Sequence, residues 1–506
     1  MLALTIYISF AGALLLAFMP KATPALARAV ALVTALAGFS VALLGFFSPA
    51  SSAFIADCAW IPSLGIRYTL AADGISRVLV LLTGLAAVSG VLFSWNIARR
   101  TSEFFAFFLA LIGGVYGVFL SADLFLLFVF YEIAIVPKYF LIAIWGSTRR
   151  EYAAMKLALY SFLGSAMVLV GLLAAYVVSG GHSMNLQALA QYPFPVAFQM
   201  WAFPLVFVGF AILAGMWPFH TWAPTGHVAA PTAASMLLAG VVMKLGAYGC
   251  LRVAMTLFPH GLDPWGWSFL GIGSWRMVFA LFAVIGIVYG AAVALVQNDF
   301  KFVIGYSSVS HMGLVLLGLM TLSQIGLDGA VLQMFSHGIL AGLLFATVGR
   351  IVYERAHTRD LDALSRMHLG KSMPFAAWLF VLAGMASMGL PGFSGFIAEL
   401  QVLIGAWTAF PWFAAVAGVG IVVGVAYTWR AMQRAFFTDA PAPSAAPHTP
   451  DASEHSFEPI TWAEKAGVLL LLAASLAVGL YPRLLLDAIT PAVLALPHTL
   501  LTGGRL

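Results

Sequence analysis

The chain has 506 residues, of which 62% are hydrophobic and only 8% are charged, and its mean hydropathy is +1.00. Soluble domains carry roughly 25% charged residues, so the composition excludes an ordinary soluble fold and predicts an all-α polytopic membrane protein. The net charge of +5 lies in short connections, which indicates membrane topology rather than nucleic-acid binding. Cys58 and Cys250 lie far apart, and no His/Cys cluster predicts an iron–sulfur, haem or zinc site.

Apolar runs of about 20 residues, the length that crosses a bilayer, predict about fourteen transmembrane helices. The first run begins at Leu2 with no basic segment before it, so we expect it to be retained as a span rather than cleaved as a signal. The predicted spans lie near residues 2–20, 26–48, 74–97, 103–121, 124–146, 153–178, 199–228, 232–256, 276–297, 302–321, 326–350, 374–407, 411–436 and 462–482.

Two of these runs, 199–228 and 374–407, are too long for one simple helix. The first contains Pro218 and Pro224, and the second contains the segment Gly389-Leu-Pro-Gly392. A helix broken inside a membrane exposes backbone groups that must line a cavity or be buried in protein. The segments at the two breaks, AGMWPF and ASMGLPGF, resemble each other and lie five spans apart. This echo indicates an inverted repeat, with chance similarity as the alternative.

The basic residues of the loops predict the orientation. If both termini lie outside the cytoplasm, most loop Lys and Arg fall on the inside, including Arg99, Arg100 and Arg150, and few fall on the outside. Residues 50–72 lack a long apolar run and predict a small hairpin on the outer face. Residues 438–460 are rich in Pro, Ala and Ser and predict a flexible inside loop.

Three charged residues stand deep inside predicted spans: Glu132, Lys244 and Glu399. A charge at a helix centre costs about 2.5–3.5 kcal/mol on insertion scales, so a function is the default interpretation. Glu132 lies roughly 13 Å into its span, and the alternative is a structural pairing with a neighbouring Arg or Lys. Lys244 is over two turns from either end, too deep to snorkel easily, and a desolvated lysine can take up and release protons. Glu399 follows the second break, which supplies water access.

Several further polar residues are candidates for a relay or a gate. His311 and His337 lie on adjacent spans among Ser and Tyr residues and predict a proton relay, with structural hydrogen bonding as the alternative. His220 and His227 flank the first break, and we expect them to shape or hydrate it. Lys301 lies near a helix start, where an ordinary inside-loop charge is the competing interpretation.

Lys138 lies on the predicted span that carries Glu132, directly after Pro137. Six residues correspond to about 240° around an ideal helix, so the two charges do not share a face unless the proline alters the geometry. A role in the path and snorkelling both stay open for Lys138. Asp123 begins the same span and is interpreted as an N-cap.

Nine short motifs occur in the order and spacing of a known membrane family. They are FYEIAIVP (130–137), HTWAP (220–224), APTAAS (230–235), MKLGAYG (243–249), DFK (299–301), YSSVSHMG (306–313), YERAHTRD (353–360), GLPG (389–392) and GFIAE (395–399). With these motifs the chain resembles, over nearly its full length, the M-subunit family of proton-translocating NADH-quinone oxidoreductase, respiratory complex I. YERAHTRD is the most subunit-specific of them.

The resemblance implies fourteen spans, two inverted five-helix repeats and discontinuous helices seven and twelve. By motif, Glu132 matches the family's helix-five glutamate, Lys244 its helix-eight lysine and Glu399 its helix-twelve glutamate. The implied divisions are 1–102 (helices 1–3 with the outer hairpin), 103–256 (first repeat, helices 4–8), 276–436 (second repeat, helices 9–13) and 437–506 (inside loop, helix 14 and tail).

One position departs from the family pattern. The family usually has a helix-seven lysine seven residues before the histidine matched here by His220, and this chain has Leu213 there. The ion pair that would tune Glu132 is therefore missing in its usual form. Either Glu132 is protonated when the path is idle, or Lys138 supplies the charge from within helix five.

The implied function is that of a proton-pumping subunit of NADH:quinone oxidoreductase, a translocase, with protons passing along Lys244, the histidines and Glu399. No cofactor is expected in this chain, while NADH, FMN, iron–sulfur clusters and quinone are expected in other subunits. The expected partners are L- and N-like membrane-arm subunits and the lipid bilayer, in the cell inner (plasma) membrane with both termini on the non-cytoplasmic side. No long lateral helix follows the last predicted span, which favours an M-like over an L-like subunit.

Three other functions are open. One is a subunit of a multi-subunit cation/proton antiporter, against which YERAHTRD argues. Another is the membrane subunit of an energy-converting hydrogenase or a related redox complex. The last is a structural subunit that has lost pumping, a hypothesis motivated by Leu213.

Overall fold

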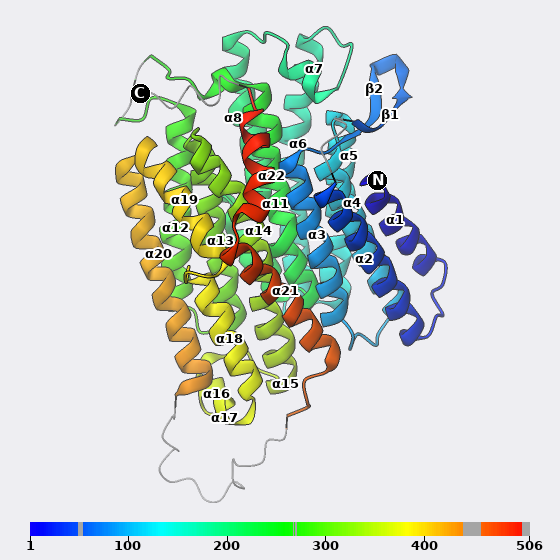
Figure 1. Ribbon diagram of the computed structural model, residues 1–506, viewed down its shortest axis with the longest axis vertical. Coiled ribbons are helices and arrows are strands. Elements are labelled where there is room, and N and C mark those ends of the chain that lie inside the picture. Colours follow the sequence, from blue (N-terminus) through cyan, green and yellow to red (C-terminus); the bar gives the residue numbers. More distant parts are fainter. Residues whose placement is uncertain (49–53, 267, 269–270, 439–456, 498–506) are drawn as a thin grey trace, which may run out of the picture.

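The apolar runs of the sequence fold into a bundle of long helices with a small β-hairpin at one end (Figure 1). In this computed structural model the described residues are 1–48, 54–266, 268, 271–438 and 457–497. Among them, twelve helices are long and apolar enough to cross a membrane. The all-α membrane fold predicted from the sequence is therefore confirmed.

The elements follow one another in a simple order, with short 3-10 or π-helical segments (η) inside or between the α-helices. In the first half they are α1 (Ala3–Ala17), α2 (Pro24–Phe47), β1 (Phe54–Ile61), η1 (Pro62–Leu64), β2 (Ile66–Ala71), α3 (Gly74–Phe93), α4 (Thr101–Leu120), α5 (Leu124–Trp145), α6 (Arg150–Val178), α7 (Leu186–Ala190), α8 (Val196–Ala214), η2 (Phe219–Thr221), α9 (Trp222–Ala229), α10 (Thr232–Leu237), η3 (Leu238–Val242), α11 (Met243–Gly249), η4 (Cys250–Met255) and η5 (Pro259–Leu262). In the second half they are α12 (Trp275–Val296), α13 (Phe300–Met320), α14 (Gln324–Phe345), η6 (Ala346–Tyr353), α15 (Glu354–Ala356), α16 (Leu361–Ser365), α17 (Leu369–Ser372), α18 (Pro374–Ser387), α19 (Ser394–Ala409), α20 (Pro411–Met432), η7 (Gln433–Phe437), α21 (Trp462–Leu480) and α22 (Arg483–Leu494).

The difference between about fourteen predicted spans and the twelve long helices has a simple cause. The predicted span 2–20 contains α1, which has only 15 residues. The predicted span 374–407 is divided into α18, with 14 residues, and α19, with 16. Each is shorter than the roughly 20 residues of a straight spanning helix. Every predicted span thus contains a helix.

Both predicted helix breaks are present, and each occurs at a glycine. α8 ends at Gly215, whose φ of 81° lies in the left-handed region that favours glycine. α18 ends at Ser387, and Gly389, with φ of 76°, turns the chain toward α19. The division of the chain into two inverted repeats stays a prediction.

The predicted hairpin is confirmed as the antiparallel pair β1–β2, although residues 50–53 lie outside the described residues. Its position on the outer face stays a prediction. Asp57 on β1 accepts hydrogen bonds from Arg67 on β2 at 2.8 and 2.9 Å. The Arg67 guanidinium holds the pKa of the Asp57 carboxyl below its usual range. Asp123 caps α5 as predicted, accepting from Phe125 N and Leu126 N, and also accepts from the backbone N–H of Arg67. We call this end of the bundle the hairpin end.

A C-terminal helix that the sequence prediction lacked, α22, packs against α3 and α14 at the hairpin end (Figure 1). Thr490 on α22 donates a hydrogen bond of 2.8 Å to the buried carboxylate of Asp328 on α14. The predicted inside loop at 438–460 falls largely on residues 439–456, which lie outside the described residues, as do the last residues of the predicted tail, 498–506.

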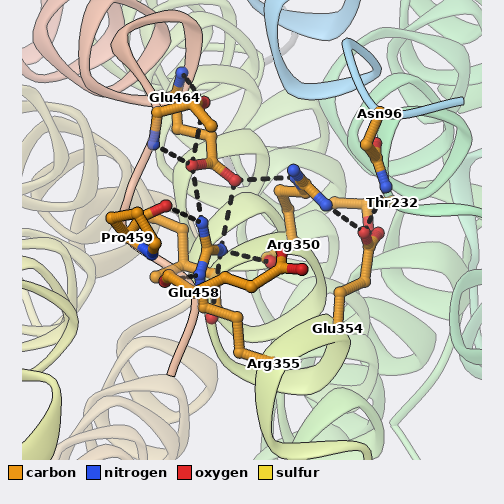
Figure 2. A network of polar contacts seen from close by, with 10 residues as sticks. Asn96, Thr232, Arg350, Glu354, Arg355, Glu458, Pro459 and Glu464 are labelled. Atoms are coloured by element: carbon orange, nitrogen blue, oxygen red, sulfur yellow. Dashed lines mark hydrogen bonds and ion pairs between the residues drawn. The ribbon is translucent and has the colours of Figure 1, made fainter. Parts of the chain in front are cut away.

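At the end opposite the hairpin, a buried carboxylate joins α21 to η6 (Figure 2). Glu464 is 1% exposed and lies between Arg350 Nε, at 2.7 Å, and Arg355 Nη2, at 2.9 Å. Arg350 also pairs with Glu354, which accepts a hydrogen bond of 2.5 Å from Asn96 in the segment after α3. The network therefore links three parts of the chain that are distant in sequence.

We expect Glu464→Gln to lower the free energy of unfolding by roughly 3–5 kcal/mol, because it leaves the buried guanidinium of Arg355 without a counter-charge and removes one of the two carboxylates that pair with Arg350. The thermal midpoint of the purified protein in detergent measures the change. Glu103→Gln is the control, since Glu103 pairs with Arg100 at an exposed surface and its loss should leave the midpoint unchanged. An unchanged midpoint in Glu464→Gln would show that the network contributes no net stability.

Candidate functional site

Lys244 lies at the centre of the site, on α11, and is fully buried. Its Nζ lies 2.8 Å from Nδ1 of His337 on α14 and donates a hydrogen bond to the carbonyl of Ala239. Ala239 belongs to the π-helical segment η3, and a second π-helical segment, η4, follows α11. π-Helical turns are rare and occur frequently at functional sites. The predicted snorkelling alternative for Lys244 is wrong, since the ammonium group is held inside the bundle.

His337 lies next to a second buried histidine as well as to Lys244. The ring centroids of His311 and His337 are 5.3 Å apart at an interplanar angle of 65°. Both side chains are buried, and they come from the neighbouring helices α13 and α14. The structure thus brings together the two imidazoles that the sequence placed on adjacent spans.

Glu399 on α19 is also buried, and it is the last of these neighbouring polar residues. A cavity of about 10 Å³ lies between it and His311, with Ser387 and Tyr427 in its wall. That volume is at the lower bound of what one water molecule needs. A Cβ at Gly389 would lie 3.0 Å from Glu399 Oε2, so the second helix break approaches this carboxylate directly. The groups from Lys244 to Glu399 therefore form a row of neighbouring polar side chains, with the small cavity between the last two.

Lys301 lies at the junction between α9, which follows the first helix break, and α10. Its side chain is 2% exposed, and Nζ donates a hydrogen bond of 3.0 Å to the carbonyl of Ala230, between α9 and α10. The alternative of an ordinary inside-loop charge is therefore wrong. The positive charges of Lys301 and Lys244 both act electrostatically on the buried ring of His227. His220, also buried, lies at η2 with its ring 5.1 Å from that of Tyr289.

Glu132 and Lys138 lie apart from this row, on α5. They form no ion pair within 4.0 Å in the described part of the chain, although each charge acts on the other. Lys138 is 1% exposed, and its Nζ has no hydrogen-bond partner among the described residues. Oε1 of Glu132 is likewise without a partner there, and Leu213 on α8 is buried. Snorkelling is therefore wrong for Lys138, and its tie to Glu132 is purely electrostatic.

Two polar residues of the site were not predicted from the sequence. Gln333 on α14 contacts the Glu399 carboxylate as a hydrogen-bond partner. Tyr427 on α20 donates a hydrogen bond of 2.7 Å to Ser307 on α13 and lines the small cavity. Their position in the interior of apolar helices is the signal that could have found them. Within the described residues, no group of three or more His, Cys, Asp or Glu side chains could hold a metal ion.

The chain matches a known protein family and is similar to named members of it. A family model described as "NADH:quinone oxidoreductase/Mrp antiporter, TM" matches residues 121–424. NADH-quinone oxidoreductase subunit M of Rhodobacter capsulatus is 38% identical over 484 residues, covering 92% of this chain and 90% of the relative. NAD(P)H-quinone oxidoreductase chain 4 1 of Synechococcus sp. (strain JA-3-3Ab) is 39% identical, covering 84% and 78%.

Solved structures have the same fold. A chain of respiratory complex I from Thermus thermophilus with bound NADH superposes with a TM-score of 0.87 and 26% identity, over 99% of this chain and 100% of that one. A chain of the Mrp complex from Dietzia sp. DQ12-45-1b gives a TM-score of 0.83 with 22% identity, over 99% of both chains. At that identity the second likeness concerns the fold alone.

We expect Lys138→Met to raise the free energy of unfolding by roughly 1–3 kcal/mol, because it removes a buried polar group that lacks a hydrogen bond and keeps a similar volume. The thermal midpoint in detergent measures the gain. The exposed Lys465 on α21 offers a control, Lys465→Met, with no expected change. A lower midpoint for Lys138→Met would contradict the expectation and would show that its charge stabilises Glu132.

Proposed function

We propose that this chain, which belongs to the NADH:quinone oxidoreductase/Mrp antiporter family and within it to the subunit M (chain 4) type, translocates protons as a membrane subunit of an NADH-quinone oxidoreductase. The observation that carries the proposal is the row of neighbouring polar side chains inside an otherwise apolar bundle. Lys244 contacts His337, the rings of His337 and His311 meet edge to face, and a small cavity lies between His311 and Glu399. Such a row is what a proton path needs, since ionisable residues in spanning segments are costly.

The chemistry of the row follows from its contacts. A protonated Lys244 donates to Nδ1 of His337, so the neutral ring carries its own proton on Nε2. When Lys244 gives its proton to Nδ1, the ring can release the Nε2 proton toward His311. From His311 the proton crosses the small cavity to Glu399, whose carboxylate lies beside Gly389 of the second helix break. Lys301, His227 and His220 supply the connection to the first break.

The distribution of charge supports an orientation with the hairpin end outside. The opposite end holds α15, α16 and α17 (Figure 1), and α15 carries Arg355 while α17 carries Lys371. Basic residues accumulate on the cytoplasmic side of membrane proteins. In this proposal the protein lies in the cell inner (plasma) membrane with both termini outside. This orientation also fits two inverted repeats, 103–256 and 276–436, between an N-terminal part, 1–102, and a C-terminal part, 437–506.

The redox chemistry belongs to other subunits in this proposal. NADH, FMN, iron–sulfur clusters and quinone are assigned to them, and this chain acts as the translocase part of the enzyme. Its exposed apolar helix faces suit contacts with lipid and with L- and N-like membrane subunits. The complex I subunits among its relatives favour this assignment over an antiporter or an energy-converting hydrogenase.

We expect Lys244→Ala or Glu399→Ala to abolish most NADH-driven proton uptake while the complex still assembles, because each removes a carrier from the row. Proton uptake into inverted membrane vesicles, read with a pH-sensitive dye, measures the loss, and native gel electrophoresis measures assembly. Lys465→Ala, at an exposed position on α21, is the matched control and should pump normally. Normal pumping by a well-assembled Lys244→Ala complex would refute the role.

The buried Leu213 motivates one competing function, a structural subunit that has lost pumping. If the leucine at position 213 had abolished pumping, Leu213→Lys would raise proton uptake above the level of the unmodified chain. We expect no such gain, because the row from Lys244 to Glu399 is complete without a charge at this position. The measurement is proton uptake by vesicles that contain either form, compared at equal rates of NADH oxidation. A clear increase in Leu213→Lys would support the structural alternative.

A further inference from the structure

A cavity of about 600 Å³ at the hairpin end has no part in the path described so far. We call it the hairpin-end vestibule, and it is lined by residues that include Asp73, Ser76, Gln187, Tyr248, Arg252 and Ala492. Asp73 is the residue that caps α3, and the others belong to α3, α7, α11, η4 and α22, so the vestibule lies where several elements meet. Its volume is ample for water.

The inner wall of the vestibule is polar. Ser76 Oγ and Tyr248 Oη are 3.1 Å apart, and Tyr248 Oη also donates to the carbonyl of Phe119 at 3.2 Å. Both side chains are 2% exposed, although both border the cavity. Buried hydroxyl groups of this kind can pass protons along hydrogen bonds.

An ion pair stands between this inner wall and the surface. Arg252 Nη1 lies 3.1 Å from Asp73 Oδ2, and the two side chains are 23% and 27% exposed. Arg252 also interacts with Tyr248. Asp73 in addition caps α3 by accepting from Ser76 N at 2.9 Å. The pair thus offers a carboxylate in contact with solvent that is joined through Ser76 and Arg252 to the Tyr248 hydroxyl.

Tyr248 brings the vestibule next to Lys244. The two residues are four positions apart on α11, which places them on one helix face about 6 Å apart along the axis. The Lys244 side chain now reaches toward Ala239 and His337, away from the vestibule. Its four-carbon stem is flexible enough to turn about the helix toward Tyr248.

We infer that the hairpin-end vestibule gives Lys244 its own proton route to the outer face, through Tyr248 and Ser76. This inference rests on the proposed function and its orientation. In the step, the Tyr248 hydroxyl first turns from the Phe119 carbonyl toward Ser76 Oγ. The Lys244 ammonium then gives one proton to Tyr248 Oη while Tyr248 gives its hydroxyl proton to Ser76 Oγ. Ser76 in turn gives its own proton to water in the vestibule. Lys244 is left neutral, both hydroxyls are restored, and one proton has reached the cavity, where the Asp73 carboxylate attracts it.

The test uses a thiol reagent that enters from one side only. The background is Cys58→Ser, which removes the exposed cysteine, while Cys250 is buried. Gln187→Cys places a thiol on the vestibule wall, and Ala188→Cys, its neighbour on α7, places one at an exposed position that does not line the vestibule. Spheroplasts that contain the whole complex are treated from outside with a bulky charged methanethiosulfonate, and inverted vesicles are then prepared from them.

We expect both cysteines to be labelled, as checked by mass spectrometry of the chain. Labelled Gln187→Cys should lose much of its proton uptake per NADH oxidised, while labelled Ala188→Cys should keep it. Equal uptake by the two labelled variants would overturn the inference, and so would failure of the outside reagent to reach Gln187→Cys. In either case the unlabelled complex still pumps, so the proposed function stands. Absence of pumping in the unlabelled complex is instead the failure of the proposed function.

A second variant examines the route itself. Tyr248→Phe removes one hydroxyl and keeps the ring that packs at 5.2 Å against Phe119. We expect this variant to assemble and to lose proton uptake per NADH oxidised, with Ser76→Ala giving the same loss. Normal uptake in an assembled Tyr248→Phe complex would overturn the route through Tyr248.

Discussion

A buried ammonium group is the constraint on which the central part of the bundle depends. Lys244 lies in the span Thr232–Met255, whose apolar stretch is wholly buried. A charge at such a depth costs about 2.5–3.5 kcal/mol unless partners offset it. The carbonyl of Ala239 and the ring of His337 are those partners. The irregular helix around Ala239 and the exact position of His337 are therefore structural conditions for keeping Lys244 inside the bundle.

The position of His337 is fixed by the helix that carries it. α14 is tied at the hairpin end, where Asp328 accepts from Thr490 of α22. Its continuation, η6, is tied at the opposite end, where Arg350 pairs with Glu464 of α21 (Figure 2). α21 and α22 are consecutive, so one C-terminal segment holds both ends of the same helix. A proton can cross a hydrogen bond only when donor and acceptor stay about 3 Å apart, and this clamp limits sliding of His337 along the bundle axis.

The parts of the fold that depend on local chemistry could be predicted from the sequence. The two breaks followed from overlong apolar runs that contain Pro or Gly, although the first lies at Gly215, ahead of the prolines that predicted it. The cap at Asp123 follows from one carboxylate at a helix start. The depth of Lys244 and Glu399 followed from counting residues along apolar runs. Contacts between distant segments could not be predicted in this way. The Glu464 network and the fold of α22 over α3 both depend on chain partners that no local pattern identifies.

The contacts of Lys244 also bear on how a path with two outlets avoids a leak. Its Nζ bonds Ala239 and His337 on the same side, and Tyr248 lies one turn away in the other direction. A single ammonium group cannot contact both sides at once. Turning toward Tyr248 breaks two hydrogen bonds in a low-dielectric interior, where each is costly to lose. The side chain therefore connects either the histidine row or the vestibule, and a continuous proton wire through both cannot form in one conformation.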